Sequence, residues 1–140
     1  MRRCVFAGVT VLVLVLGSSL AAQVTTRDGP IVKLDEGYEA VDRGRASVGT
    51  LVRRRVPITS FASGRVELRV VGTSCPCTRA QVEDTTLGAG ESTVLELATT
   101  AADVPNPQYY TATLEVIERD DADRVLRTER RTTGIGYAPD

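Results

Sequence analysis

The feature that most constrains the fold of this chain is a two-residue alternation of apolar and polar side chains. In Arg65-Val66-Glu67-Leu68-Arg69-Val70, every second residue is apolar and the residues between are charged. Successive side chains of a β-strand point to opposite faces, so the alternation predicts a strand with one buried and one solvated face. The stretch from Tyr109 to Glu118 repeats the pattern, with Ala112, Leu114 and Val116 on the apolar face.

Short turn signals separate further stretches of this kind. Ser63-Gly64, Gly88-Ala89-Gly90 and Pro105-Asn106-Pro107 punctuate the chain, and Asp120 to Asp123 reads as a hairpin loop. A helix over Val125 to Arg131 is a weaker alternative to a returning strand, because only two of its residues are apolar. We therefore expect an all-β fold, an antiparallel immunoglobulin-like β-sandwich of about seven strands over residues 45–138.

The alternation also names the residues of the expected core. They are the apolar members of the predicted strands: Val56, Ile58, Val66, Leu68, Val70, Leu95, Leu97, Leu114 and Val116. A Val70→Asp substitution is expected to unfold such a domain, because it buries an unpaired charge. The chain has no Trp, and the two cysteines of its body are two residues apart, so the core has no cross-sheet disulfide or packed Trp.

The first 44 residues differ from the rest. Two arginines precede an apolar run from Val5 to Leu16, and small residues follow up to Ala22, which is the layout of a cleaved signal peptide over residues 1–22. The run is shorter than a membrane-spanning helix needs, so a retained anchor is the weaker alternative. Residues 23–44 are expected to form a flexible leader with one possible edge strand at Ile31-Val32-Lys33-Leu34. The mature protein is therefore expected in the periplasm or outside the cell, without stable membrane insertion.

The overall charge and the residue types exclude several functions. Seventeen Lys and Arg against eighteen Asp and Glu give a formal net charge of -1, which argues against sequence-independent binding of nucleic acid. The chain has no His, which removes the commonest general base and metal ligand. Asp120, Asp121 and Asp123 lack the spacing of a calcium loop. We expect no catalytic residues, no metal and no cofactor.

A run of three arginines lies in a predicted strand. Val52, Arg54, Val56 and Ile58 share one face of this strand, and Pro57 restricts the strand to a sheet edge or a bulge. The Arg53-Arg54-Arg55 run could bind a carboxylate or phosphate, because guanidinium groups form paired hydrogen bonds with both. The preferred interpretation is a solvated face of an edge strand, where charge opposes aggregation.

The motif whose side chains could carry out chemistry is Thr73-Ser74-Cys75-Pro76-Cys77-Thr78. Its two thiols can close a small disulfide, bind a soft metal such as cuprous ion, or stay reduced. A disulfide requires a bend, because an extended chain holds Cα atoms two residues apart at roughly 6.6 to 7 Å. Two thiolates are too few for a structural zinc site. A structural turn with paired or inert thiols is preferred over a redox role.

The same motif carries a family resemblance. Together with Leu87-Gly88-Ala89-Gly90-Glu91-Ser92, it resembles the bacterial domain-of-unknown-function family 1573, over about residues 49–118. The resemblance implies an exported immunoglobulin-like sandwich with a Ser-Cys-Gly-Cys-Thr motif, and it implies no reaction. Pro76 stands where the family usually has Gly, which makes the turn stiffer, and Ala89 stands where it has Pro.

Two functions follow as hypotheses. The first is an exported, non-catalytic binding or structural module that contacts an unknown protein partner of the cell envelope, through its surface or an exposed strand edge. The second is a thiol-based redox or copper-binding protein that uses Cys75 and Cys77, with Arg79 close enough in sequence to favour a thiolate. Removal of both cysteines discriminates between them, because it abolishes only the second function.

Overall fold

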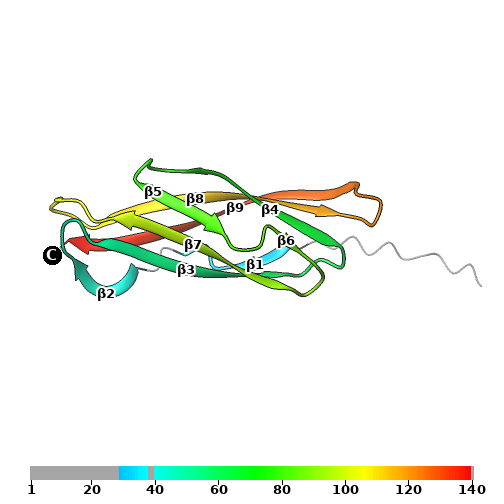
Figure 1. Cartoon of the computed structure of the whole chain (residues 1–140), viewed down its shortest axis with the longest axis horizontal. Helices are drawn as coiled ribbons and strands as arrows, with labels where there is room; N and C mark the ends of the chain where they lie inside the picture. Colours follow the sequence, from blue (N-terminus) through cyan, green and yellow to red (C-terminus); the bar gives the residue numbers. More distant parts are fainter. Residues whose placement is uncertain (1–28, 38–39, 140) are drawn as a thin grey trace, which may run out of the picture.

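The computed structural model describes residues 29–37 and 40–139 and shows two β-sheets packed face to face (Figure 1). No helix occurs in these residues, and thus none that could cross a membrane. The strands, in chain order, are β1 (Val32–Leu34), β2 (Ala40–Ala46), β3 (Leu51–Ser60), β4 (Arg65–Thr73), β5 (Thr78–Val82), β6 (Thr86–Leu87), β7 (Ser92–Thr100), β8 (Gln108–Arg119) and β9 (Val125–Pro139). The predicted signal peptide, residues 1–22, lies outside the described residues.

The strands form a four-stranded sheet in the order β1-β3-β7-β5 and a five-stranded sheet in the order β2-β9-β8-β4-β6. Neighbouring strands are antiparallel, apart from the parallel pair β2 and β9. The predicted all-β antiparallel sandwich is thus confirmed, with nine strands in the described residues where about seven were expected. The segment 23–44 was expected to form a leader with one edge strand. It contains all of β1 and the beginning of β2.

The core lies between the sheets and follows the period-two pattern. Eight of the nine expected core side chains are at most 2% exposed. The exception is Val70, which is only partly buried and lies at a register shift of β4 against β8. Because Val70 keeps some contact with solvent, we expect Val70→Asp to destabilise the domain less than the same change at its cross-strand neighbour Leu114, which is fully buried.

Pro57 does not mark an edge strand. Strand β3 lies inside its sheet, between β1 and β7, which corrects the sequence-based interpretation. Pro57 is tolerated there because β1 is short: its last residue, Leu34, pairs with Ile58, the residue that follows Pro57 in β3, so β1 ends one position short of the proline. Beyond that point, this side of β3 has no β1 ladder to complete, so the missing N–H group costs no hydrogen bond with β1.

The chain from Val125 onward is a long strand, and the weaker helical alternative is therefore wrong. The preceding turn is built by Asp120, whose carboxylate accepts hydrogen bonds from the backbone N–H groups of Ala122 and Arg124, each at 2.9 Å. The Arg124 backbone N–H, above all, lowers the pKa of Asp120, and the Arg124 side chain adds to this effect. Asp123 completes the turn with a positive φ of 64° and an ion pair to Arg65. These carboxylates stabilise a hairpin tip, as expected.

Candidate functional site

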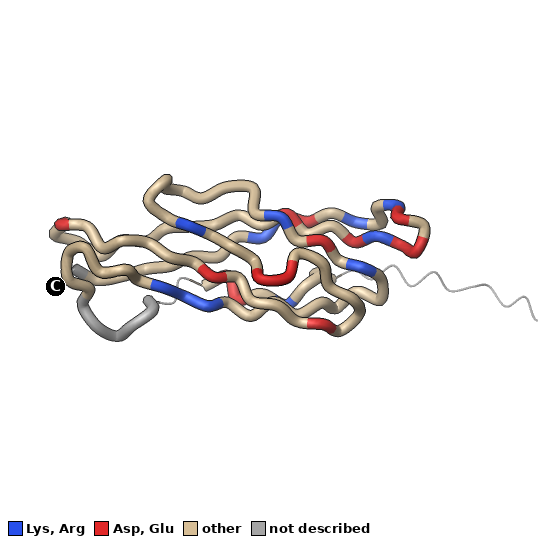
Figure 2. Tube along the Cα trace, viewed as in Figure 1, with Lys and Arg blue, Asp and Glu red and all other residues tan. Residues whose placement is uncertain are grey.

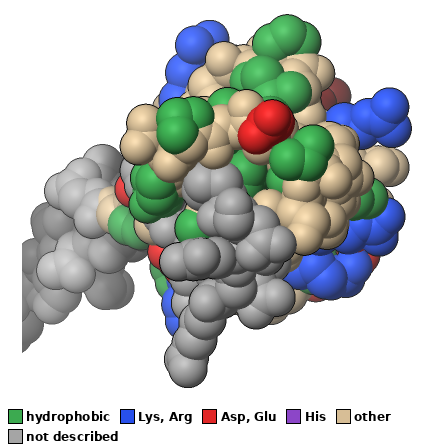
Figure 3. All heavy atoms as spheres, turned by 90° about the vertical axis from the view of Figure 1, so that its left-hand side faces the viewer, with side chains coloured by type: hydrophobic (Ala, Val, Ile, Leu, Met, Phe, Trp, Pro, Cys, Tyr) green, Lys and Arg blue, Asp and Glu red, His purple; other side chains and the backbone are tan. Residues whose placement is uncertain are grey.

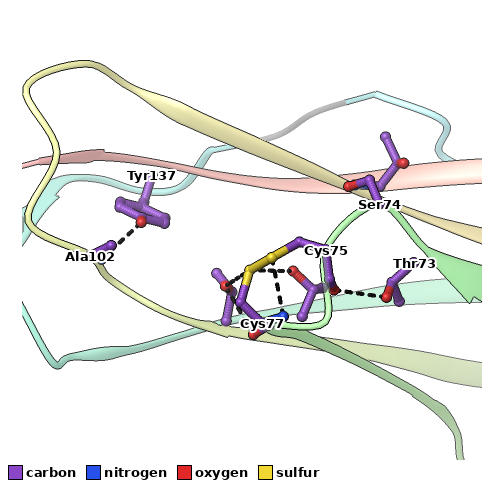
Figure 4. The surroundings of a disulfide bond; sticks show 9 residues. Thr73, Ser74, Cys75, Cys77, Ala102 and Tyr137 are labelled. Atoms are coloured by element: carbon purple, nitrogen blue, oxygen red, sulfur yellow. Dashed lines mark hydrogen bonds between the residues drawn. A yellow bond between two sulfur atoms is a disulfide. The ribbon is translucent and has the colours of Figure 1, made fainter.

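The cysteine turn connects the two sheets, because it lies between the end of β4 in one sheet and the start of β5 in the other (Figure 4). Cys75 and Cys77 form a disulfide with a Cα–Cα distance of 5.1 Å, well below the span of an extended segment. A turn provides the necessary bend, with the Thr78 N–H donating to the Cys75 carbonyl at 3.1 Å. Of the three thiol states that the sequence left open, the structure therefore contains the disulfide.

Hydrogen bonds tie the turn to both sheets. The Ser74 N–H donates to the Thr111 carbonyl and the Thr111 N–H donates to the Ser74 hydroxyl, both at 2.8 Å, which fixes the turn to β8. On the other side, the Thr99 hydroxyl of β7 donates to the Cys77 carbonyl at 3.3 Å. The disulfide thus lies where the chain crosses from one sheet to the other, in a turn that hydrogen bonds hold to both sheets, directly before the edge strand β5.

Replacing both cysteines with serine is expected to have a small effect on stability. Opening so short a ring restores little freedom to the unfolded chain, about 1.5 kcal/mol on the loop-entropy estimate. Urea unfolding of Cys75→Ser/Cys77→Ser measures this difference. In the wild-type protein purified from outside the cytoplasm and denatured, mass spectrometry should find Cys75 and Cys77 alkylated only after reduction. Alkylation without a reductant would contradict the disulfide.

The β5 edge of the four-stranded sheet is open. The Glu83 N–H donates to the Val94 carbonyl at 3.0 Å, so the bonds between β5 and β7 fall on odd-numbered residues. The N–H and carbonyl groups of Ala80 and Val82 therefore face away from β7. No described strand pairs with them on that side. The edge presents unsatisfied backbone donors and acceptors in the geometry that another strand requires.

The opposite edge of the same sheet is closed. The outward carbonyls of Val32 and Leu34 in β1 accept hydrogen bonds from the Arg131 guanidinium of β9, at 2.7 and 3.4 Å. Burial opposes the charge of Arg131, but its hydrogen bonds to Glu36 and Glu129 raise the pKa of the guanidinium above the ordinary value. Arg131 thus remains charged and occupies the positions that an added strand would need.

A groove of about 400 Å³ runs over the outer face of the four-stranded sheet, beside the β5 edge. Its walls include Arg53 of β3 and Arg79 of β5, its floor includes Ala98 of β7, and Cys77 also lines it. Leu51 contributes an apolar side chain to the groove. Leu51 is the first residue of β3 and is half exposed. Figure 3 shows hydrophobic side chains on the surface at one end of the sandwich.

The three arginines of the Arg53-Arg54-Arg55 run have different surroundings. Arg55 reaches the outer face and pairs with Glu83 at 2.7 Å and with Glu96 at 3.3 Å. Figure 2 shows these basic and acidic segments side by side on β3, β7 and the chain after β5. Arg53 has only a 4.0 Å contact with Glu96. The side chains of Arg53 and Arg55 are more than half exposed, so the prediction that the arginine run is solvated is confirmed for these two residues.

Arg54 contradicts that expectation, because its side chain is only 6% exposed and lies between the sheets. Its guanidinium donates to the carbonyls of Gly37 and Gly134 at 2.6 and 2.5 Å, and to Asp35 at 3.1 Å. The signal was present in the sequence, since Arg54 shares a face with apolar residues. The buried arginine is a structural clamp that binds the segment after β1 to β9, and it is not available to a ligand.

No group of three or more potential metal ligands occurs in the part of the chain that the structure describes. Beside the β5 edge, the structure instead brings together the outward backbone groups of β5, the exposed side chains of Arg53 and Arg79, and the disulfide. Arg79 and its place beside the groove were not predicted as a binding feature, because the sequence does not reveal which strand lies next to β5.

The fold resembles solved structures of low sequence identity. A PapD-like domain of human CEP192 has a TM-score of 0.58 at 7% identity, over 87% of this chain and 96% of that domain. WR4, a C. elegans member of the MSP family, has a TM-score of 0.52 at 12% identity, over 79% of this chain and 100% of that one. These likenesses support an immunoglobulin-like or PapD-like sandwich and show the fold alone.

The Vibrio cholerae VesB protease also contains a similar domain, with a TM-score of 0.54 at 15% identity over 77% of this chain. The chain spans 32% of the length of that protein. No family model and no curated protein matches the chain. The resemblance to the family 1573 therefore stays a prediction.

Proposed function

We propose that the protein is an exported, non-catalytic binding module of the cell envelope, which takes an extended segment of a partner protein as an additional strand along β5. The observation that carries the proposal is the outward orientation of the Ala80 and Val82 backbone groups at an unpaired edge. The signal-peptide pattern of residues 1–22 and a disulfide suited to an oxidising compartment support the exported location.

The contrast between the two edges of the sheet supports the choice of β5. Arg131 occupies the outward carbonyls of β1, whereas nothing in the described residues occupies those of β5. Main-chain hydrogen bonds supply affinity in strand addition, while side chains on alternate residues supply specificity. Because β5 has only five residues, the few main-chain bonds give modest affinity, so we expect side-chain contacts to select the partner.

A short soluble peptide of alternating Thr and Val residues tests this proposal. In an NMR titration of the whole protein, the amides of Ala80 and Val82 should shift and exchange more slowly with solvent, because they become hydrogen-bonded. An Ala80→Pro variant should lose this binding, since proline removes the outward N–H group at a position that makes no bond to β7. Circular dichroism and a melting curve confirm that the variant is folded.

The β1 edge is the internal control for this experiment. The amides of Val32 and Leu34 should not respond to the peptide, because Arg131 covers that edge. If the peptide perturbs β1 and leaves β5 unchanged, or if folded Ala80→Pro binds as the wild type does, strand addition at β5 is wrong.

The second candidate function is thiol exchange at Cys75 and Cys77. It is favoured by the exposure of Cys77 and by the position of Arg79, whose positive charge is near enough in sequence to stabilise a thiolate. The Cys75→Ser/Cys77→Ser variant discriminates between the two candidates. Retention of peptide binding and of the cellular phenotype by this variant would remove the support for a thiol function.

A further inference from the structure

We propose that the partner segment carries a glutamate whose carboxylate enters the groove and binds Arg79 and Arg53. This inference rests on the proposed strand addition at β5 and specifies the chemistry of the occupant. The evidence is the register of three neighbouring strands, the ion pairs of the arginines, and the alternation of side chains along β5.

The register places the two arginines on either side of a small residue. Arg53 pairs with Ala98 in the β3–β7 ladder, and Ala98 pairs with Arg79 in the β7–β5 ladder. Adjacent strands are about 4.8 Å apart, so the backbones of the two arginines are roughly 10 Å apart. Ala98 leaves the space between them unfilled, and the two long side chains can meet a single carboxylate above it.

The two guanidinium groups also have hydrogen-bonding capacity to spare. Arg55 is engaged by Glu83 and Glu96. Arg53 has one long contact with Glu96, and the Arg79 side chain makes no ion pair or hydrogen bond with any residue of the described ranges. Three arginines (Arg53, Arg55 and Arg79) thus face two glutamates (Glu83 and Glu96), which leaves an excess of positive charge around the groove. Guanidinium groups bind carboxylates through paired hydrogen bonds, which makes an acidic side chain the complementary ligand.

The alternation along β5 decides which residue of the partner supplies the acid. Ala80 and Val82 would bond to the added strand, so Arg79 would face the partner at a position without hydrogen bonds, where opposing side chains lie closest. The Arg79 side chain is on the outer face, together with the groove. A glutamate opposite Arg79 is long enough to lean across one strand toward Ala98, whereas aspartate reaches less far.

The test compares peptides that differ at one position. The probe is the alternating Thr and Val peptide with a central Glu, and the matched peptides carry Gln or Asp there. Wild-type protein should bind the Glu peptide about tenfold more tightly than the Gln peptide, as expected for charge-assisted hydrogen bonds, with the Asp peptide between them. The preference should shrink as salt is added, because the arginines are exposed.

Arginine variants identify the residues responsible. Arg79→Gln should abolish the preference for Glu over Gln, and Arg53→Gln should reduce it. Arg130→Gln is the matched control, because Arg130 is an exposed arginine on β9 in the other sheet and its loss changes the net charge equally. This control should keep the wild-type preference.

The outcomes separate this inference from the function on which it rests. If the Glu and Gln peptides bind along β5 with equal affinity, the glutamate site is wrong while strand addition stands. If Arg130→Gln loses the preference as fully as Arg79→Gln does, general surface charge explains the selectivity and the site is wrong. If none of the peptides binds to β5, both proposals are wrong.

Discussion

Arg54→Met is expected to lower the free energy of unfolding by about 2 kcal/mol, because it leaves the buried Gly134 carbonyl without a donor. The Arg54 guanidinium donates to Gly37 and Gly134, and the Gly134 residue is buried. Each unsatisfied buried polar group costs roughly 1 to 3 kcal/mol, and methionine fills much of the volume without donating a hydrogen bond. Asp35 loses its partner at a smaller cost, because its side chain is 60% exposed and returns to water.

The matched control lies one residue earlier in the same strand. Arg53→Met makes the same chemical change on the outer face, where the side chain has a single 4.0 Å ion contact and is solvated. We expect this variant to change stability by less than about 0.5 kcal/mol. Urea unfolding followed by circular dichroism measures both. Equal stabilities of the two variants would show that Arg54 does not clamp the segment after β1 to β9.

Arg54 also illustrates what the sequence could and could not predict. The period-two pattern assigned it correctly to the face of Val52, Val56 and Ile58, yet its charge and its two arginine neighbours favoured a solvated strand. A buried arginine requires acceptors, and these come from Gly37 and Gly134, which the fold brings together from distant parts of the sequence. Local patterns contain no information about such partners.

The strands themselves were predictable because side-chain alternation is a local property. The neighbours of each strand were not, since they depend on pairing between residues far apart in the chain. Pro57 was assigned to an edge because the sequence does not show that β1 is too short to reach it. For the same reason, the cysteine motif could be placed in a turn, but the crossing between sheets and the groove beside Arg79 required the register.

Leu114→Asp is expected to unfold the domain at neutral pH. The Leu114 side chain is fully buried between the sheets, so the substitution places an ionised carboxylate in the apolar core. Burial of an unpaired charge costs several kcal/mol, in addition to the packing lost with leucine. A domain of this size is stable by about 5 to 15 kcal/mol, so the combined loss is comparable with its whole stability.

The cross-strand neighbour of Leu114 provides the comparison that tests the sandwich core. Val70→Asp changes a partly buried residue that pairs with Leu114 across the two strands. Its carboxylate can reach water, so the loss of stability should be smaller. Val71→Asp, at an exposed position of the same strand, should melt nearly as the wild type does. Circular dichroism melting should therefore rank the variants in the order of their burial, with Leu114→Asp unfolded at room temperature. A Leu114→Asp variant that melts like Val71→Asp would mean that the two sheets do not enclose a dry interior, because only water can solvate a carboxylate at so small a cost.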